Sequence, residues 1–299
     1  MSARYRIAAA LTPALLLLAG PTSALALNVN EDYRPQDEFK LDTWFSIGPI
    51  HFNKAIMYIL IATGLTVGTM LWISKRMHQK PNKVQTAVEV LYTLMRDNIT
   101  RGNMSDKMAA TWFPFIGALF LFIWFSNMIG YLPLPTNTEH TVDIFGLQVP
   151  SLALYAATAN LSVPLALTLV VWFSYHVVGV KNHGVIGYLK TWVPAGVEGP
   201  ATGPIFMIEV ISHFVRLVSL SVRLFANILA GHLLILFMGG GLVVLLNLAF
   251  VGSLVLGLIT GTMAIAFFLF EVGLVATLQA FIFATLTSIY LGAAASESH

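Results

Sequence analysis

The chain has 299 residues, of which 57% are hydrophobic and only 10% are charged, and its mean hydropathy is +0.78. Soluble domains carry roughly 25% charged residues, so this composition predicts a protein that crosses a membrane several times. The net charge of +2 is too small to favour nucleic-acid binding, and the absence of cysteine excludes disulfides, cysteine nucleophiles and thiolate metal sites.

The N-terminus has the features of a secretory signal. Two arginines precede an apolar run over residues 7–19, and an A-x-A cleavage motif ends at Ala26. We expect residues 1–26 to be a signal peptide and residues 27–53 to form a segment on the periplasmic side of the membrane. The alternative is a short additional membrane anchor, although the run is shorter than the roughly 20 residues of a full span.

An uncharged apolar stretch over about residues 55–74 predicts the first membrane span. The positive-inside rule places the loop after it in the cytoplasm. Residues 84–99 then place apolar side chains at helical spacing with charges on the other side, which predicts an amphipathic helix on the cytoplasmic surface. The basic residues of the loop are Lys75, Arg76, Lys80 and Lys83.

Two further spans are predicted over about residues 112–131 and 151–178, and the second of these contains Asn160. The loop between them contains two acidic residues and no Lys or Arg, so we place it on the outer side of the membrane. Lysines follow the second of these spans and return the chain to the cytoplasm.

The C-terminal part contains two longer apolar stretches, over residues 204–238 and 242–291, separated by a triple glycine. As helices they would be about 50 and 75 Å long, against a hydrocarbon core of about 30 Å. We therefore expect either two long, steeply tilted helices or a break of the second stretch into two spans near Gly273. The whole pattern predicts an all-α membrane protein with about five transmembrane helices and a cytoplasmic C-terminus.

Few polar groups interrupt these long stretches. An arginine at the bilayer centre costs about 3 kcal/mol or more and keeps its proton at physiological pH, so we expect Arg223 to be functional without carrying protons itself. The charged residues are Glu209, Arg216, Arg223 and Glu271, and the main polar ones are His213, His232, Asn227, Asn247 and Gln279.

Helical geometry predicts how these groups are arranged. On a continuous helix, Arg216 and Asn227 lie within about 40° of Arg223 around the axis. Glu209 falls on the same stripe, about 21 Å away along the axis, whereas His232 projects from the opposite face. One polar stripe is therefore expected along the first long helix.

Arg223 has no acidic residue three or four positions away, which excludes an ion pair with a neighbour on its own helix. Its counter-charge is expected on Glu271 or on a partner protein. Glu209 and Arg216, seven positions apart, are expected to be too distant to pair within the helix. The groups able to relay protons are Glu209, His213, His232 and Glu271.

Other chemistries find little support. The chain lacks the metalloprotease, Walker and nucleophile-elbow motifs, so we expect no catalytic residue, no metal and no cofactor. A secondary ion transporter is the main alternative, but it would show repeated halves, which this chain lacks. A purely structural membrane scaffold would tolerate replacement of Arg223.

The segments SLSVRLFANILAGH and TLQAFIFATLTSIYL closely resemble the a subunit of bacterial F-type ATP synthases. The resemblance covers about residues 40–299 and implies a proton-translocating stator subunit of the cell inner membrane, with residues 54–299 as its membrane domain. It also implies two half-channels and two long helices that pack along a rotor, the c-ring. The implied partners are the c-ring, the b subunits of the peripheral stalk, membrane lipid and the transported ion, H⁺ or Na⁺.

The resemblance also implies roles for single residues. Arg223 matches the arginine that faces the c-ring carboxylate, and Asn227 is the asparagine of the same motif. Gln279 matches a glutamine near that arginine. Glu209 matches an acid that lines one half-channel.

His232 resembles a histidine of the mitochondrial and alphaproteobacterial branch that is partnered by a glutamate on the last helix, and Glu271 looks like that partner. Two features depart from the family pattern. Glu271 lies eight residues before Gln279, where seven is the common spacing. Asn160 stands where an acid is common in the third span.

Overall fold

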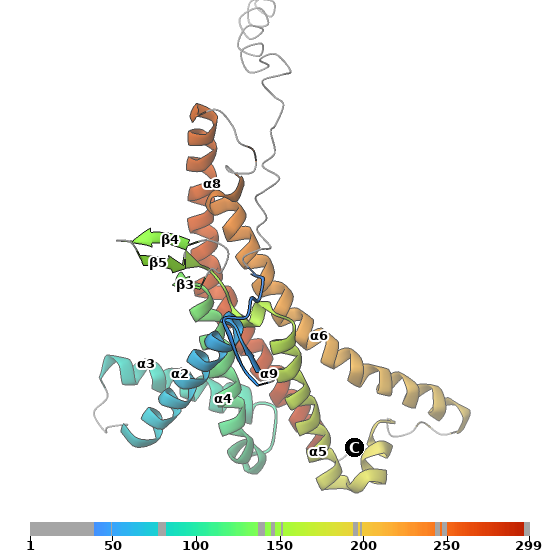
Figure 1. The fold of residues 1–299 in the computed structure, drawn as a ribbon. Coiled ribbons are helices and arrows are strands. Elements are labelled where there is room, and N and C mark those ends of the chain that lie inside the picture. Colours follow the sequence, from blue (N-terminus) through green and yellow to red (C-terminus); the bar gives the residue numbers. More distant parts are fainter. Residues whose placement is uncertain are drawn as a thin grey trace, which may run out of the picture. The chain divides into compact units, whose positions relative to one another are not determined.

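Most of the membrane region is described by a computed structural model of the chain (Figure 1). Five helices in the described part are long and apolar enough to cross a membrane, which confirms the predicted all-α membrane fold. The predicted signal peptide lies outside the described residues. These are residues 39–48, 50–76, 82–136, 141–144, 147–150, 152–193, 197, 199–242, 246 and 250–295.

The first span is helix α2, Lys54–Arg76, close to the predicted range. Helix α4, Asp106–Gly130, forms the second span and packs against α2 and against the last helix, α9, Ala276–Ala295. Buried apolar side chains of α4 and α9 belong to one large core cluster. This core fixes the positions of the residues at the C-terminal end of α4.

The predicted amphipathic helix is built from α3, Lys83–Thr93, and a π-helical continuation, η2, Leu94–Arg101. In η2, Met95 and Ile99 are buried in the core that α4 and α9 form. The hydroxyl of Ser288 in α9 donates a hydrogen bond to the Ile99 carbonyl at 2.8 Å. The second half of the amphipathic helix is therefore held by the helical core.

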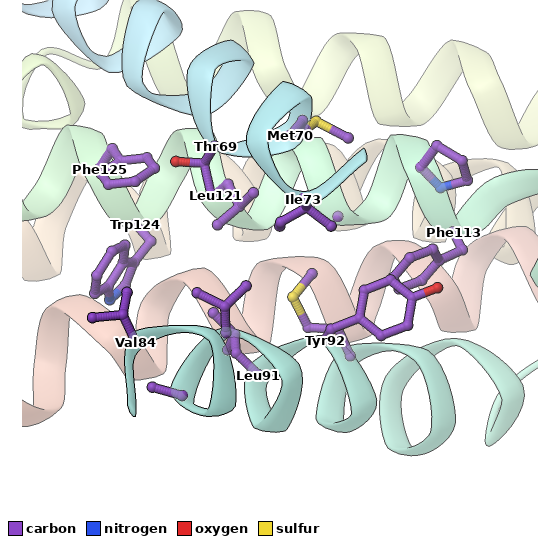
Figure 2. Close-up of a pocket in the computed structure, with 15 residues that line it drawn as sticks. Thr69, Met70, Ile73, Val84, Leu91, Tyr92, Phe113, Leu121, Trp124 and Phe125 are labelled. Carbon is purple, nitrogen blue, oxygen red and sulfur yellow. The ribbon is translucent and has the colours of Figure 1, made fainter. Parts of the chain in front are cut away.

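Helices α2, α3 and α4 line an apolar cavity of about 570 Å³ (Figure 2). The lining contains no Asp, Glu, Lys, Arg or His, and its polar side chains include Thr69 and Tyr92. Such a lining does not suit the passage of an ion. The other residues around the cavity are Met70, Ile73, Val84, Ala87, Val88, Leu91, Met95, Phe113, Pro114, Gly117, Leu121, Trp124 and Phe125.

The third span begins later than predicted, because helix α5 covers Ser162–Thr191. Asn160 precedes this helix, and its side-chain oxygen accepts a hydrogen bond from the Ser162 N–H at 3.0 Å. The preceding residues are apolar because they pack inside the protein. Ala156, for example, is fully buried beside Gly130. Irregular backbone is tolerated at such a place because the protein itself shields it from lipid.

Helix α5 changes direction at Gly184, whose φ of 70° is accessible mainly to glycine. After this kink, Tyr188 packs directly against Gly179, where a Cβ would overlap the tyrosine ring. The lysines that were expected in a loop, Lys181 and Lys190, lie within α5. The kink therefore brings the end of α5 back onto its own preceding turns.

Short antiparallel two-stranded sheets lie in the connections and were not predicted. Their short lengths leave the helical class unchanged. The pairs are β1, Phe45–Ile47, with β2, Ile50–Phe52; β3, Leu134–Pro135, with β6, Leu152–Ala153; and β4, Thr141–Ile144, with β5, Leu147–Pro150.

Two long helical stretches complete the chain, as predicted. Helix α6, Thr202–Leu236, leads into a π-helical turn, η5, Phe237–Gly241. The second stretch runs from Phe250 to Ala295 through α8, Phe250–Phe270, a π-helical turn, η6, Glu271–Val275, and α9. It is one helical run that contains Gly273 within its π turn, so the alternative of two separate spans is excluded.

The chain divides into two compact units. One contains residues 233–267, and the other contains residues 37–232 and 268–299. All of the residue clusters described below lie within the second unit.

Candidate functional site

One face of α6 is exposed from its first turn to Ala230. Exposed side chains recur every three or four residues along it, as expected for one face of a helix. Among its apolar side chains, the face carries Arg223 and, one turn later, Asn227. The large apolar residues are Met207, Ile208, Ile211, Phe214, Val215, Val218 and Val222.

Arg223 lies in this apolar face beside a groove of about 570 Å³. No acidic side chain among the described residues lies within ion-pair distance of it. Glu271, one of the two expected counter-charges, is instead buried and hydrogen-bonded to Tyr131. The guanidinium is therefore available to a carboxylate on another protein.

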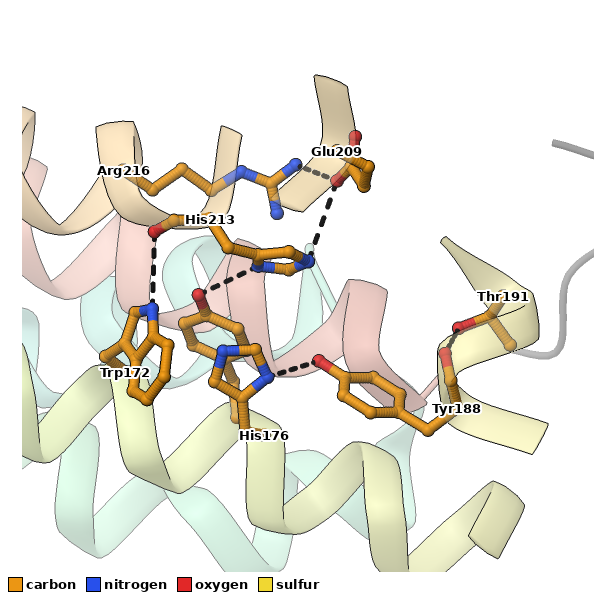
Figure 3. A network of polar contacts seen from close by, with 8 residues as sticks. Trp172, His176, Tyr188, Thr191, Glu209, His213 and Arg216 are labelled. Carbon is orange, nitrogen blue, oxygen red and sulfur yellow. Dashed lines mark hydrogen bonds and ion pairs between the residues drawn. The ribbon is translucent and has the colours of Figure 1, made fainter. Parts of the chain in front are cut away.

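A polar cluster surrounds Glu209 on the same helix (Figure 3). Arg216 Nη2 lies 2.8 Å from Glu209 Oε1, and His213 Nε2 lies 3.7 Å from the same oxygen. The expectation that Glu209 and Arg216 are too distant to pair is wrong. Helical side chains lean toward the N-terminus, and the long arginine side chain reaches back over two turns.

His213 connects this cluster to α5, as Figure 3 shows. Its Nδ1 is hydrogen-bonded to the Tyr175 hydroxyl at 3.0 Å, and its carbonyl accepts a hydrogen bond from Trp172 Nε1 at 3.2 Å. The ring of His176 lies 4.9 Å from that of His213, between centroids. His176 Nδ1 is in turn hydrogen-bonded to the Tyr188 hydroxyl at 2.8 Å. A chain of polar groups thus extends from α6 across α5.

A cavity of about 220 Å³ lies among α5, α6 and α9, and Glu209, His213 and Arg216 line it. Two lining residues, His213 and Trp192, each have a buried ring nitrogen that finds no hydrogen-bond partner among the described residues. A water molecule occupies about 30 Å³ of liquid, so the cavity has room and polar partners for several waters. The cluster is suited to a hydrated ion path.

A second cluster surrounds Glu271, which is 8% exposed. The Tyr131 hydroxyl donates a hydrogen bond to Glu271 Oε2 at 3.0 Å. Burial raises the pKa of Tyr131, which lies just beyond α4, and the adjacent Glu271 carboxylate raises it further. The phenol therefore keeps its proton and acts as a donor. On its other side the Glu271 carboxyl group lies against Gly231 of α6.

His232 is fully buried next to this cluster. Its Nδ1 lies 2.9 Å from the Ile228 carbonyl oxygen, and its Nε2 lies 3.0 Å from the Gly130 carbonyl oxygen. Its ring lies against that of Tyr131, with 4.6 Å between centroids. Among the described residues no hydrogen bond joins His232 to Glu271, and Tyr131 contacts both side chains.

The π turn η6 explains the unusual spacing of Glu271 and Gln279. Eight residues of α-helix would place the two side chains about 80° apart around the axis. A π turn accommodates one extra residue, so the pair takes the positions that a seven-residue α-helical spacing would give. Both side chains are buried, at 8% and 5% exposure. The Ala276 carbonyl, directly after the turn, accepts a hydrogen bond from Asn127 Nδ2 at 3.2 Å.

The predicted residues thus fall into separate groups. Glu209 and His213 meet in one cluster, and His232 and Glu271 lie in another. Arg223 and Asn227 occupy the exposed face, Gln279 is buried in α9, and Asn160 lies before the N-terminus of α5.

Sequence reasoning missed Tyr131, His176 and Tyr188. A tyrosine at the end of a span usually marks the membrane interface, so Tyr131 carried no specific signal. His176 and Tyr188 lie in a stretch whose kink the sequence did not predict. Their roles depend on contacts between helices, which a helical pattern in one segment cannot reveal.

A sequence model of the family described as ATP synthase A chain matches residues 56–292. A relative from Maricaulis maris, named ATP synthase subunit a, is 33% identical over 274 residues, which are 90% of this chain and 99% of the relative. A relative of the same name from Bradyrhizobium diazoefficiens is 34% identical over 272 residues, 89% of this chain and 98% of the relative. A third relative, from Rubrobacter xylanophilus, is 30% identical over 254 residues, which are 84% of this chain and 87% of the relative.

Proposed function

The chain belongs to the ATP synthase A chain family, and on that premise we propose that it is the stator subunit through which protons cross the membrane beside a rotating c-ring. Family membership makes it a multi-pass membrane subunit of the Fo sector of ATP synthase, which works with other subunits of that complex. The proposal adds the path of the ion and the residues that control it.

The placement of Arg223 carries this proposal. A permanent cation lies in an exposed apolar face without an acidic partner among the described residues. Such a charge is costly in a membrane unless a counter-charge meets it there. A carboxylate on each passing c subunit supplies that counter-charge, and the apolar side chains around Arg223 form the surface along which the ring slides.

The two polar clusters serve as the ends of two half-channels. Along α6, Glu209 lies about 21 Å before Arg223 and His232 lies about 13.5 Å after it. The cluster around Glu209 lines a polar cavity with room for water, and the cluster around His232 contains the buried Glu271 carboxyl group. Asn227 extends the polar surface next to Arg223, one turn later on α6.

The charge of Arg223 separates the two paths. It favours the ionised carboxylate as a c subunit passes and repels protons, so protons cross only by travelling with the ring. Each charge that crosses releases about 2.3 kcal/mol per 100 mV, which the ring converts into rotation. The chain itself carries out no nucleotide chemistry in this scheme.

The orientation follows from the charges of the loops. We place the chain in the bacterial inner membrane with residues 27–53 in the periplasm after removal of residues 1–26, and with the C-terminus in the cytoplasm. Residues 54–299 form the membrane domain, in which the two long helices lie at a steep tilt along the ring. The b subunits of the peripheral stalk and membrane lipid are the further partners.

ATP-driven proton pumping into inverted membrane vesicles tests the role of Arg223. Replacement of Arg223 by Ala or by Lys should abolish pumping while the complex still assembles, because neither residue supplies the same delocalised charge at that place. The control is Arg101→Ala, which removes an arginine of η2 that lies outside the spanning helices. Near-normal pumping by Arg223→Ala in the assembled complex contradicts the proposal.

A further inference from the structure

Two consecutive residues at the end of α4 contact both titratable groups of the second cluster. The carbonyl of Gly130 lies 3.0 Å from His232 Nε2, and the hydroxyl of Tyr131 donates to Glu271 at 3.0 Å. His232 and Glu271 come from α6 and from the π turn before α9, so the end of α4 is the element that both share. Neither the sequence motifs nor the family resemblance assigned a role to this dipeptide.

Tyr131 is held firmly in its place. It is 2% exposed, and its ring lies 4.6 Å from the His232 ring and 5.9 Å from the Phe268 ring, between centroids. Its backbone N–H donates to the Met128 carbonyl at 3.2 Å. A side chain packed on two sides cannot turn away easily, so its hydroxyl is a fixed donor at a defined point.

The Glu271 carboxyl group is confined between this donor and α6. A Cβ on Gly231 would lie 2.5 Å from Glu271 Oε2 and 2.7 Å from Oε1, so the carboxyl group fits only because residue 231 is a glycine. Among the described residues, Tyr131 makes the side-chain hydrogen bond to this carboxyl group. The position of the carboxyl group is therefore set by Tyr131 on one side and by the bare backbone of Gly231 on the other.

Both ring nitrogens of His232 lie within hydrogen-bond distance of backbone carbonyl oxygens. A ring nitrogen bonds a carbonyl oxygen only when it carries a hydrogen, so both bonds of His232 exist together only in the doubly protonated ring. In the structure both nitrogens point at carbonyl oxygens, those of Ile228 and Gly130. Proton exchange between His232 and Glu271 would require the ring to leave these partners.

We propose that Tyr131 is a positioning residue for ion translocation, which holds the Glu271 carboxyl group against Gly231. In this arrangement Glu271 exchanges its proton with water of the half-channel, and His232 joins α6 to the end of α4. The inference rests on the proposed function, since it assigns Glu271 to the ion path.

The variant Tyr131→Phe removes the hydroxyl and keeps the ring contacts with His232. Thr277→Val is the matched control, because the Thr277 hydroxyl of α9 accepts a hydrogen bond from Trp124 Nε1 of α4 at 3.1 Å and this bond includes no titratable group. In inverted vesicles, Tyr131→Phe should lower ATP-driven pumping about tenfold, as expected for the loss of a hydrogen bond to a carboxylate. Thr277→Val should stay within about twofold of the unmodified protein, because the lost hydrogen bond includes no group of the proposed ion path.

Infrared spectroscopy of the purified complex gives a readout that a merely structural role would not move. The carboxyl band of Glu271 is the one that Glu271→Gln removes. It should shift in Tyr131→Phe, and also in Gly231→Ala, which displaces the carboxyl group from the other side. It should not shift in Thr277→Val.

The results separate this inference from the proposed function. Pumping by Tyr131→Phe equal to that of Thr277→Val, or an unmoved band, overturns the positioning role even if Arg223→Ala abolishes pumping. Normal pumping by Arg223→Ala overturns the proposed function, while the infrared band still decides whether Tyr131 holds Glu271. If Tyr131→Phe fails to assemble, the band in Gly231→Ala decides, and an unmoved band there overturns the inference.

Discussion

Glu209 and Arg216 lie two turns apart on α6 and form an ion pair, with Arg216 Nη2 2.8 Å from Glu209 Oε1. The same arginine lies over the ring of Tyr290 in α9, 5.7 Å from its centroid. His213 Nε2 approaches the same carboxylate oxygen at 3.7 Å. Arg216 therefore organises the polar cavity, whereas Arg223, seven residues later, faces outward from the same helix.

Arg216→Ala should lower ATP-driven pumping several-fold, because it leaves Glu209 without its cation and removes a contact with Tyr290. Both partners of the pair are about one-third exposed, so the coupling between Glu209 and Arg216 should be about 1 kcal/mol. The double variant Glu209→Gln/Arg216→Ala measures this coupling from pumping rates, with Arg101→Ala as the control. Strictly additive losses would show that the pair has no functional role.

Exchanging His232 and Glu271 tests whether the two residues interact directly. Since Tyr131 contacts both side chains and no hydrogen bond joins His232 to Glu271 among the described residues, we expect His232→Glu/Glu271→His to pump no better than either single variant. Pumping in inverted vesicles is the measurement, with the amount of assembled complex determined in parallel. Recovery of pumping in the exchanged protein would point to a direct partnership and contradict the observed arrangement.

Deleting Gly273 tests the π turn. The deletion should convert η6 into regular α-helix and leave Glu271 and Gln279 on the same face, because a π turn differs from an α turn by one inserted residue. We therefore expect assembly and measurable pumping. Deletion of Ala284, which is fully buried in regular α-helix, is the control and should prevent assembly by rotating the rest of α9 about 100°. Equal failure of both deletions would refute this account of the spacing.

Gly130→Ala should destabilise the protein, because the new Cβ would lie 2.8 Å from Ala156 Cα and 3.2 Å from its backbone nitrogen. Backbone cannot move aside as a flexible side chain can, so the cost should be about 1–3 kcal/mol. Thermal unfolding of the purified protein in detergent is the measurement. Gly117→Ala is the control, since its Cβ would meet only the end of Met95, at 3.6 Å. An unchanged midpoint temperature of unfolding for Gly130→Ala would show that the segment before α5 can shift to make room for the new Cβ.

Hydropathy located the spans well where an apolar run was bounded by charges, as in α2 and α4. It failed at the start of α5, because a segment buried inside the protein is as apolar as one exposed to lipid. Ala156 shows this, being completely buried in irregular backbone. The length of the last apolar stretch could not distinguish one long helix from two spans, because amino-acid composition does not reveal a π turn.

At the site, too, helical periodicity predicted some features correctly and missed others. Periodicity predicted that Arg223 and Asn227 share one face of α6 and that His232 lies on the other, and their exposure agrees. Periodicity underestimated the reach of Arg216, because the length and lean of a side chain are not part of a helical pattern. It gave no indication of Tyr131, which meets Glu271 across a separation of 140 residues.

The sequence by itself determined the membrane class, the approximate spans, the family motifs and the face of α6 that carries Arg223. These properties depend on composition and on the repeat of a single helix. Only the tertiary structure decided that Tyr131 binds Glu271, that His232 bonds to backbone carbonyls and that Glu209 pairs with Arg216 beside a polar cavity. Such contacts depend on how separate helices pack and on which side chains then come within a few ångströms of each other, and no local pattern contains that information.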